Sequence, residues 1–278
     1  MKEHVRAFAP ANISLVFKAY KRKNPRMSGS WGVGFTLTEG VVVEVEKALK
    51  TQILFNGAQI HMPTISDVLQ SITKEKILLR IETKLPLGCG FGISGATALA
   101  AAYAINKLLQ LQIPKEELAA IAHTAEVRNK TGLGDVTNQF FGGFLFKGKP
   151  SSFFSVTQIP FTKKVVYCRV FGALSTKGVL KDRVLLQKIN KVATKKLLAI
   201  KNILDKKTLF LEDIFSISKQ FVVESGLLKN GEVKKTIEEI EKKGGHATMI
   251  ILGNAVVSNI AFSGATRFSL SKKGAIVL

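Results

Sequence analysis

The sequence predicts an α+β fold of two closely packed domains, residues 1–150 and 151–278. Three observations support this prediction. Strand patterns dominate the first eighty-odd residues, two strong helix patterns follow, and a second series of strand and helix patterns begins near residue 150. A chain of 278 residues is long enough for one large or two medium domains, and no low-complexity linker separates the two halves.

The first segments are rich in Val, Ile and Phe and alternate in the manner of strands. HVRAF and ISLVFKAY are interpreted as strands on either side of a turn at Pro10-Ala11-Asn12. Further strands are expected in VVVEVEKAL, QILFNGAQIHM and KILLRIETKLP, with a hairpin at Asn56-Gly57 and a short helix in ISDVLQSI. The N-terminal half is therefore expected to be rich in strands.

Helix patterns occupy the middle of the chain. SGATALAAAYAINKLLQ consists of strong helix formers with a small-residue face. PKEELAAIAHTAEV begins at Pro114 and carries acids in its first turn, where the helix dipole favours them. TGLGDVTNQFFGG is expected to be a glycine-punctuated loop that runs into more helix or turn, and GFLFKG to be a strand.

The second half begins with a predicted strand, KVVYCRVFG, and a predicted loop, ALSTKGVLKD. Three helices are expected at about 182–204, 209–228 and 231–243. The closing segments ATMIILGNAVVSNIAFSG and GAIVL have strand patterns. We therefore expect helices packed on a sheet in this half.

The chain is strongly basic, with 41 Lys and Arg against 20 Asp and Glu, a net charge of +21. Such a charge favours polyanions, including nucleic acid and phosphorylated metabolites. Nine of the basic residues lie between Lys181 and Lys207, but that segment has no aromatic residue and its leucines recur at helical spacing. We interpret it as the solvated face of an amphipathic helix and expect no nucleic-acid partner. A basic nucleic-acid-binding protein remains the alternative from another functional class.

Neither a metal pattern nor a disulfide pattern involves the two cysteines, Cys89 and Cys168. The N-terminal segment MKEHVRAFAP lacks the apolar core of a signal peptide, and no run approaches the ~20 apolar residues of a membrane helix. We therefore expect a cytoplasmic protein with no membrane partner.

The most informative segment is LPLGCGFGISGATALA, residues 85–100, in which Gly90, Gly92 and Gly95 satisfy G-x-G-x-x-G. A dinucleotide site would need a second strand ending in an acid about 20 residues further on. The acids found there, Glu116 and Glu117, begin a helix instead. A Walker-type P-loop is excluded because the chain contains neither Gly-Lys-Ser nor Gly-Lys-Thr.

A different kind of phosphate loop fits the same residues. Free N–H groups at a helix N-terminus favour an anion, and glycines let the backbone approach it closely. Ser94, near the helix start, would then cap the helix or touch a phosphate-bound Mg²⁺. The alternative is a tight strand-to-helix turn with Ser94 as a simple cap, but the number of glycines exceeds what a cap requires.

PLGCGFGISGA resembles the phosphate loop P-x-x-x-G-L-G-S-S-A-A of the GHMP small-molecule kinases. Ile93 replaces the first serine of that motif and Gly95 its first alanine. The resemblance implies ATP and Mg²⁺ as cofactors, an N-terminal α/β domain like part of a ribosomal protein, and a ferredoxin-like C-terminal domain. The residues that it implies for nucleotide binding are Pro86, Gly88, Gly90, Phe91, Gly92, Ile93, Ser94, Gly95 and Ala96.

Other segments resemble further motifs of this superfamily. AFAPANISLVF takes the place of the first motif, but Asn12 stands where many members carry a lysine, so that lysine's role cannot be transferred. HTAEVRNKTGLGDVTNQFFGG resembles the stretch that implies Glu126, with Ser94, as Mg²⁺ ligands and Asp135 as the catalytic carboxylate facing the acceptor hydroxyl. Without these roles, Glu126 would be an exposed helix acid and Asp135 a loop cap.

The last motif is matched only loosely, by GGHATMIILGN. Gly244, Gly245 and Ala247 take the place of its glycine-rich turn, and His246 is the side chain there that could touch an anion.

The set of motifs MSGSWGVGF, GCGFGISGA, TGLGDVTNQFFGG and ALSTKGVL is similar to the archaeal pantoate kinases. This resemblance implies transfer of the γ-phosphoryl group of ATP to the 4-hydroxyl of pantoate, a step of archaeal coenzyme A biosynthesis. A related kinase acting on mevalonate or homoserine, or a binding protein of the same fold without turnover, remains an alternative.

A small hydroxy acid needs a cation or a group of N–H donors for its carboxylate. The candidate cations are Arg6, Arg26, Arg128 and Lys177. The SGSWG segment is a candidate nest of N–H groups, and the remaining substrate-side candidates are Ser28, Gly29, Ser30, Gly32 and Asn12. The sequence leaves open whether the protein is a homodimer.

Overall fold

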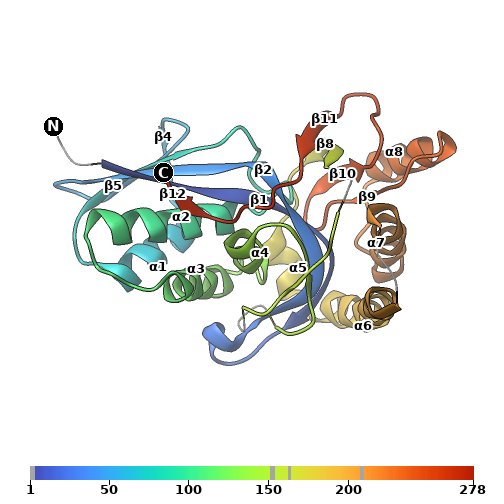
Figure 1. The fold of residues 1–278 in the computed structure, drawn as a ribbon, viewed down its shortest axis with the longest axis horizontal. Coiled ribbons are helices and arrows are strands. Elements are labelled where there is room, and N and C mark those ends of the chain that lie inside the picture. The colour runs from blue at the N-terminus through green and yellow to red at the C-terminus, as the bar shows by residue number, and fades with distance from the viewer. Residues whose placement is uncertain (1–3, 151–153, 162–163, 207–209) are drawn as a thin grey trace.

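The structure, a computed structural model, describes residues 4–150, 154–161, 164–206 and 210–278. It is a mixed α+β fold with a larger and a smaller sheet (Figure 1). The larger sheet has the strand order β12–β1–β2–β5–β3–β4, with β6 beside β2 and β7 beside β6. Its strands are β1 (His4–Tyr20), β2 (Gly29–Lys47), β3 (Gln52–Phe55), β4 (Ala58–Gln59), β5 (Ile77–Glu82), β6 (Phe144–Lys147), β7 (Thr157–Gln158) and β12 (Ile276–Val277).

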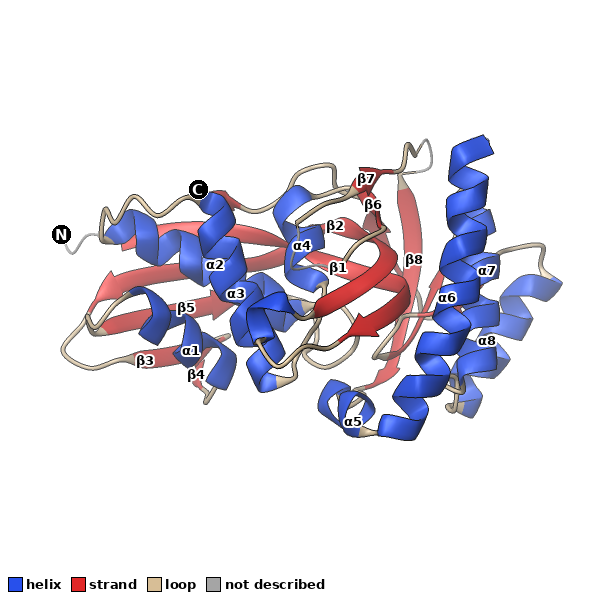
Figure 2. Ribbon diagram, turned by 90° about the horizontal axis from the view of Figure 1, so that it is seen from below, coloured by secondary structure: helices blue, strands red, loops and turns tan. Residues whose placement is uncertain are grey.

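Four helices cover one face of this sheet (Figures 1 and 2). They are α1 (Pro63–Ile72), α2 (Ile93–Leu108), α3 (Lys115–Asn129) and α4 (Asp135–Phe141), and a short 3₁₀ turn, η1 (Pro25–Met27), precedes β2. Helix α2 is apolar on every side because it packs on β1 and β2 as well as on α1, α3 and α4. Its alanines, which the sequence pattern had indicated as a small-residue face, let these neighbours approach closely.

The smaller sheet has the order β11–β8–β10–β9. Its strands are β8 (Val165–Gly172), β9 (Ala247–Met249), β10 (Asn254–Ser258) and β11 (Thr266–Ser269). The helices of this half are α5 (Thr176–Lys181), α6 (Arg183–Lys206), α7 (Leu211–Ser225) and α8 (Gly231–Lys242). Figure 1 shows α6, α7 and α8 at the end of the molecule away from β4 and β5.

The turn expected at Pro10-Ala11-Asn12 was wrong. β1 runs through these residues, and its pairing with β2 shifts register between Pro10 and Asn12 and again between Ser14 and Val16. Such bulges bend a strand without ending it, and they accommodate a proline that has no N–H for the ladder. The first bulge also turns the N–H of Asn12 out of the ladder, so that it donates to the carbonyl of Phe91 at 2.9 Å.

The bent strand β1 connects the two parts of the fold. At its far end, Asn190 of α6 makes two hydrogen bonds with the backbone of Ala19, at 2.8 and 3.1 Å. Ser218 of α7 donates to the carbonyl of Leu15 at 2.6 Å. The last strand, β12, returns to the larger sheet and pairs with β1. The domain boundary near residue 150 stays a prediction.

The loop expected over ALSTKGVLKD was also wrong, because it contains α5. Ser175 caps this helix by accepting a hydrogen bond from the N–H of Gly178 at 3.1 Å. A serine three residues before a glycine was too weak a pattern to indicate a helix of six residues.

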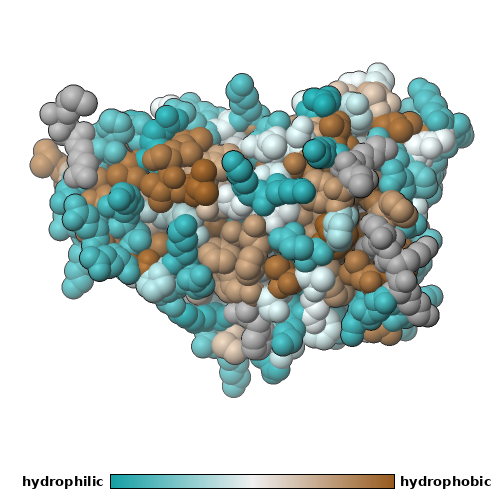
Figure 3. Space-filling model, in the orientation of Figure 1, coloured by the Kyte–Doolittle hydropathy of each residue, from teal (hydrophilic) through white to brown (hydrophobic). Residues whose placement is uncertain are grey.

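Teal, hydrophilic residues cover much of the face shown in Figure 3. A brown, apolar patch lies over β12, where Ile276, Val277 and Leu278 are exposed. In the part of the chain that the structure describes, no helix has the length and apolar character needed to cross a bilayer.

Candidate active site

A cavity of about 520 Å³ lies where the two parts of the fold meet. Its walls come from the glycine loop before α2, the turn between α3 and α4, the segment before α1, helix α5 and the turn before β10. Ser14, Phe17 and Ser30 line it from β1 and β2. The cavity therefore collects residues from segments that are far apart in the sequence.

The glycine loop has a backbone that only glycine adopts without strain. Gly88, Gly90 and Gly92 have φ values of +74°, +89° and +64°. Gly92 precedes the first residue of α2, and no side chain caps that helix. The N–H groups of its first turn are therefore available to an anion.

Both parts of the fold hold this loop in place. A Cβ added at Gly253 would lie 2.1 Å from the carbonyl oxygen of Cys89, and one at Gly90 would lie 2.6 Å from Cγ2 of Ile250. The turn at Ile251–Gly253 thus packs directly against the loop. Beside it, the ring of Phe91 packs against the ring of Phe268, with 5.8 Å between the ring centroids.

The expected glycine-rich turn of the last motif lies elsewhere. Gly244 and Gly245 do not line the cavity, and His246 instead bonds through Nδ1 with the hydroxyl of Ser216 at 3.1 Å. Ile251 and Leu252, seven and eight residues beyond Gly244, line the cavity instead.

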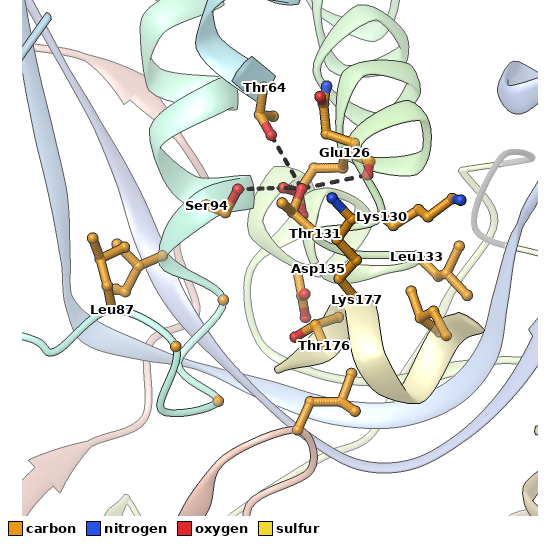
Figure 4. Close-up of a pocket in the computed structure, with 18 of the residues that line it drawn as sticks. Thr64, Leu87, Ser94, Glu126, Lys130, Thr131, Leu133, Asp135, Thr176 and Lys177 are labelled. Atoms are coloured by element: carbon orange, nitrogen blue, oxygen red, sulfur yellow. Dashed lines mark hydrogen bonds between the residues drawn. The ribbon is translucent and has the colours of Figure 1, made fainter. Parts of the chain in front are cut away.

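Ser94 lies beside a buried carboxylate. Its hydroxyl donates to Oε1 of Glu126 at 2.5 Å, and the hydroxyl of Thr131 donates to the same oxygen at 2.5 Å (Figure 4). Thr131 also bonds with Thr64 of α1 at 3.1 Å. The alternative interpretations, with Ser94 as a simple cap and Glu126 as an exposed helix acid, are therefore wrong: Ser94 makes no cap hydrogen bond and Glu126 is 2% exposed.

The surroundings of Glu126 fit a Mg²⁺ site. Burial, together with the nearby charge of Asp135, raises the pKa of Glu126 to about 7, and the hydrogen bonds from Ser94 and Thr131 oppose that rise. A cation bound beside the carboxylate would favour its ionised form. A Cβ at Gly132 would lie 2.1 Å from Oε2 of Glu126, so glycine keeps space beside that oxygen. The described residues hold no cluster of three His, Cys, Asp or Glu. Mg²⁺ needs none, since it commonly binds one or two carboxylates and substrate phosphates.

Asp135 begins α4 at the other side of Gly95, which has no side chain to separate it from Glu126. Its Oδ1 accepts from Nδ2 of Asn12 at 2.6 Å and from the hydroxyl of Ser14 at 3.5 Å. Burial raises the pKa of Asp135, while Lys147 and the two hydrogen bonds oppose that rise. Asn12, expected on the substrate side, is fully buried and instead orients Asp135.

Sequence reasoning missed Lys147, at the end of β6. The residue is 3% exposed, and its Nζ donates to the carbonyl of Gly134 at 2.8 Å. Burial lowers the pKa of Lys147 to about 8, while the charge of Asp135 opposes that shift. The lysine that ends the apolar strand pattern FLFK could have indicated this residue, because a lysine is rarely buried unless it pairs with a charge or has a function.

A second missed residue is His123 of α3, which is 1% exposed. Its Nε2 lies 2.8 Å from the carbonyl oxygen of Ser28, and its Nδ1 has no partner. Burial lowers the pKa of His123 to about 4, so the ring is neutral at physiological pH. Ser28 thus fixes the histidine rather than lining the cavity.

The structure separates the predicted nucleotide residues into two groups. Gly88, Gly90, Phe91, Gly92, Ile93 and Ser94 line the cavity, whereas Pro86, Gly95 and Ala96 do not. All of the SGSWG segment after Ser28 belongs to strand β2 and is not a nest of free N–H groups. Of its residues only Ser30 lines the cavity, while Gly29 and Gly32 pair with β1.

Of the four candidate cations, only Lys177 lines the cavity. Figure 4 shows its side chain rising from α5 toward Thr131. The Nε of Arg6 lies 4.0 Å from Oε2 of Glu44. Arg26 forms a bidentate ion pair with the carboxylate of Glu117, with N···O distances of 2.7 and 2.5 Å. Arg26 and Arg128 line a separate surface pocket.

Comparison with known proteins agrees with this geometry. Residues 54–143 match the family model described as the GHMP kinases N terminal domain. A pantoate kinase of Methanocaldococcus jannaschii is 30% identical over 271 residues, which cover 96% of this chain and 92% of that protein. A pantoate kinase of Methanospirillum hungatei JF-1 is 28% identical, and the match covers 99% of this chain and 90% of that protein. A solved structure described as a phosphotransferase related to the CoA biosynthesis pathway shares the fold, with a TM-score of 0.85 and 24% sequence identity. The match covers 99% of this chain and 98% of that chain.

Proposed function

This chain belongs to the GHMP kinases, in the family of the pantoate kinases, and from that premise we propose that it transfers the γ-phosphoryl group of ATP to the 4-hydroxyl of pantoate. Its reaction class is ATP-dependent phosphotransfer to an alcohol. The observation that carries the proposal is the position of Ser94, Glu126 and Asp135 together at the end of the glycine loop.

The glycine loop forms the nucleotide side of the site. When bound, ATP supplies the phosphoryl group and Mg²⁺ neutralises the charge that develops on it. Backbone N–H groups of the loop and of the first turn of α2 would hold the phosphates. Ser94 and Glu126 would hold the metal ion, and Lys177, which points toward Thr131 and was expected on the substrate side, would neutralise phosphate charge.

Asp135 forms the acceptor side. Asn12 and Ser14 fix the orientation of its carboxylate through Oδ1. Asp135 would orient the acceptor hydroxyl and take its proton as the phosphoryl group is transferred. The buried ammonium of Lys147 favours the ionised form of Asp135, which the proton acceptor must have.

The acceptor is tested by ADP release with Mg²⁺-ATP and a panel of pantoate, mevalonate, homoserine and shikimate. Pantoate is expected to give the highest kcat/KM of the four. A higher kcat/KM with another acid would show that this acid, rather than pantoate, is the substrate of the kinase. Turnover with none of the four would contradict the proposal. A DNA mobility shift at physiological salt would support the nucleic-acid alternative.

We also infer that the protein works in the cytoplasm on small molecules. A homodimer stays a prediction, and light scattering coupled to size-exclusion chromatography measures it. The exposed apolar patch of Ile276, Val277 and Leu278 on the edge strand β12 is the surface to substitute if a dimer forms.

A further inference from the structure

Lys130 lines the cavity, and two further cations, Lys21 and Arg183, lie near it on other elements. Lys21 follows β1, Lys130 ends α3 and Arg183 begins α6. Lys130 and Arg183 lie close enough to Lys21 that their charges add to burial in lowering its pKa. Lys21 donates through Nζ to the carbonyl of Leu180, and Leu180 and Lys130 both line the cavity. We call Lys21, Lys130 and Arg183 the rim cations.

Nothing in the described part of the chain neutralises this group through an ion pair. Asp182, the acid next to Arg183 in the sequence, instead caps α6, because its Oδ1 accepts a hydrogen bond from the N–H of Leu185 at 2.9 Å. Like charges held together in this way oppose folding, and a bound anion relieves the repulsion. The cluster therefore indicates an anionic occupant.

The backbone at Lys130 is an independent sign of function. This residue ends α3 in the left-handed conformation, with φ of +59°, where glycine is the favoured residue. A lysine at such a position costs stability, and strained positions of this kind concentrate at binding sites. Figure 4 shows Lys130 beside Leu133, across the cavity from Leu87.

The remaining walls identify which anion suits the rim. The phosphates would occupy the glycine loop, whereas Phe17, Leu133 and Leu180 add apolar surface to the cavity that Asp135 also lines. An acceptor with a methyl-bearing carbon chain and one carboxylate matches this combination of an apolar wall and a cationic rim. We propose that the rim cations capture the carboxylate of the acceptor and draw it into the cavity with its hydroxyl toward Asp135. This inference rests on the proposed function.

The test removes the three charges together in K21Q/K130Q/R183Q. The expected result is about a tenfold lower kcat/KM for pantoate at low salt, mainly through KM, with a weaker dependence on ionic strength. The KM for ATP should change less than threefold. The matched control, K191Q/K195Q/K201Q, removes three charges from exposed positions of α6 and should behave as the wild type.

Three results would overturn the inference: an unchanged KM for pantoate, an equal loss in the control, or an equal rise in the KM for ATP. A second variant, Lys130→Gly, should raise both the melting temperature and the KM for pantoate, since it removes strain and charge together. A raised melting temperature with an unchanged KM would leave Lys130 without a binding role.

The two proposals fail in different ways. Mevalonate, homoserine and shikimate also carry a carboxylate, so the rim is tested with whichever acid the wild type phosphorylates best. A preference for one of these acids removes pantoate but not the rim site, whereas turnover on none removes both.

Discussion

In the proposed function, the two sides of the cavity would recognise their ligands by different means. The nucleotide side is built from the backbone of one short segment, Leu87–Ser94, whose three left-handed glycines expose N–H groups. The acceptor side is built from side chains, with Asn12, Asp135 and Lys147 meeting from β1, α4 and β6. Backbone conformation is therefore the vulnerable feature on one side, and single polar side chains are the vulnerable feature on the other.

The difference has a physical basis. Phosphates present many equivalent oxygens, so a row of N–H groups satisfies them without a specific side chain. A hydroxyl must lose its proton at one atom, which requires one carboxylate held in one orientation. Substitutions on the two sides should consequently affect different kinetic constants, and the following variants test that separation.

Asp135→Asn should have the largest effect. It preserves the shape of the side chain but removes the proton acceptor, so kcat should fall by about 10²–10⁴-fold. The affinity for an ATP analogue, measured by calorimetry, should stay within about threefold of the wild type because the glycine loop is intact. A large loss of nucleotide affinity would mean that Asp135 belongs to both sides.

Gly90→Ala tests the nucleotide side. Its φ of +89° and a Cβ 2.6 Å from Ile250 would force the loop to shift. The KM for ATP should rise on the order of tenfold, since backbone strain costs about 1–3 kcal/mol. Gly57→Ala is the control, because Gly57 has φ of +83° but no atom within 4 Å of the added Cβ. That variant should lose stability while its KM for ATP stays unchanged.

Lys147→Met tests the charge beside Asp135. Without the ammonium, the pKa of Asp135 rises further. We expect the acidic limb of the kcat profile to move to higher pH, so that kcat on that limb falls by about tenfold for each unit of the shift and recovers at higher pH. Lys149→Met, at an exposed position two residues away, should keep the wild-type profile. An unshifted limb in Lys147→Met would contradict this role.

The smallest expected effect is on the stability of the nucleotide-free protein. The pKa of Glu126 is about 7 in the folded state, above its ordinary value of 4.5. The folded protein therefore binds more protons than the unfolded chain between these pH values, and stability falls as pH rises from about 5 to 8. The loss is at most about 3 kcal/mol. Melting temperatures across this range should flatten in Glu126→Gln, and a parallel decline in both proteins would assign the effect to other groups.

The nucleotide side was predictable because its residues are contiguous. The glycine spacing, the helix former behind it and Ser94 all lie within one segment, so local pattern and motif agree. Glu126 and Asp135 followed from their own motif. The continuous course of β1 through Pro10 could not be read locally, because the bulge depends on pairing with β2 and on a hydrogen bond to Phe91.

The acceptor side was harder to predict for the same reason. Lys147 lies near Asp135, with its Nζ on the carbonyl of Gly134, only because β6 pairs with β2. Asn12 bonds to Asp135 only because β1 bends toward the glycine loop. Arg26 and Arg128 were attractive as isolated cations, but the fold brings them together at a different pocket. Side-chain sites assembled from distant segments need the tertiary structure, whereas backbone sites within one segment do not.

The most direct test of the account is the identity of the product. The wild type should be incubated with Mg²⁺-ATP and pantoate, and the product examined by phosphorus and proton NMR. We expect the phosphorus signal to couple to the two methylene protons at C4, which places the phosphate on the primary hydroxyl facing Asp135. Coupling to the methine proton at C2, or ADP formation without a phosphorylated acid, would contradict the account.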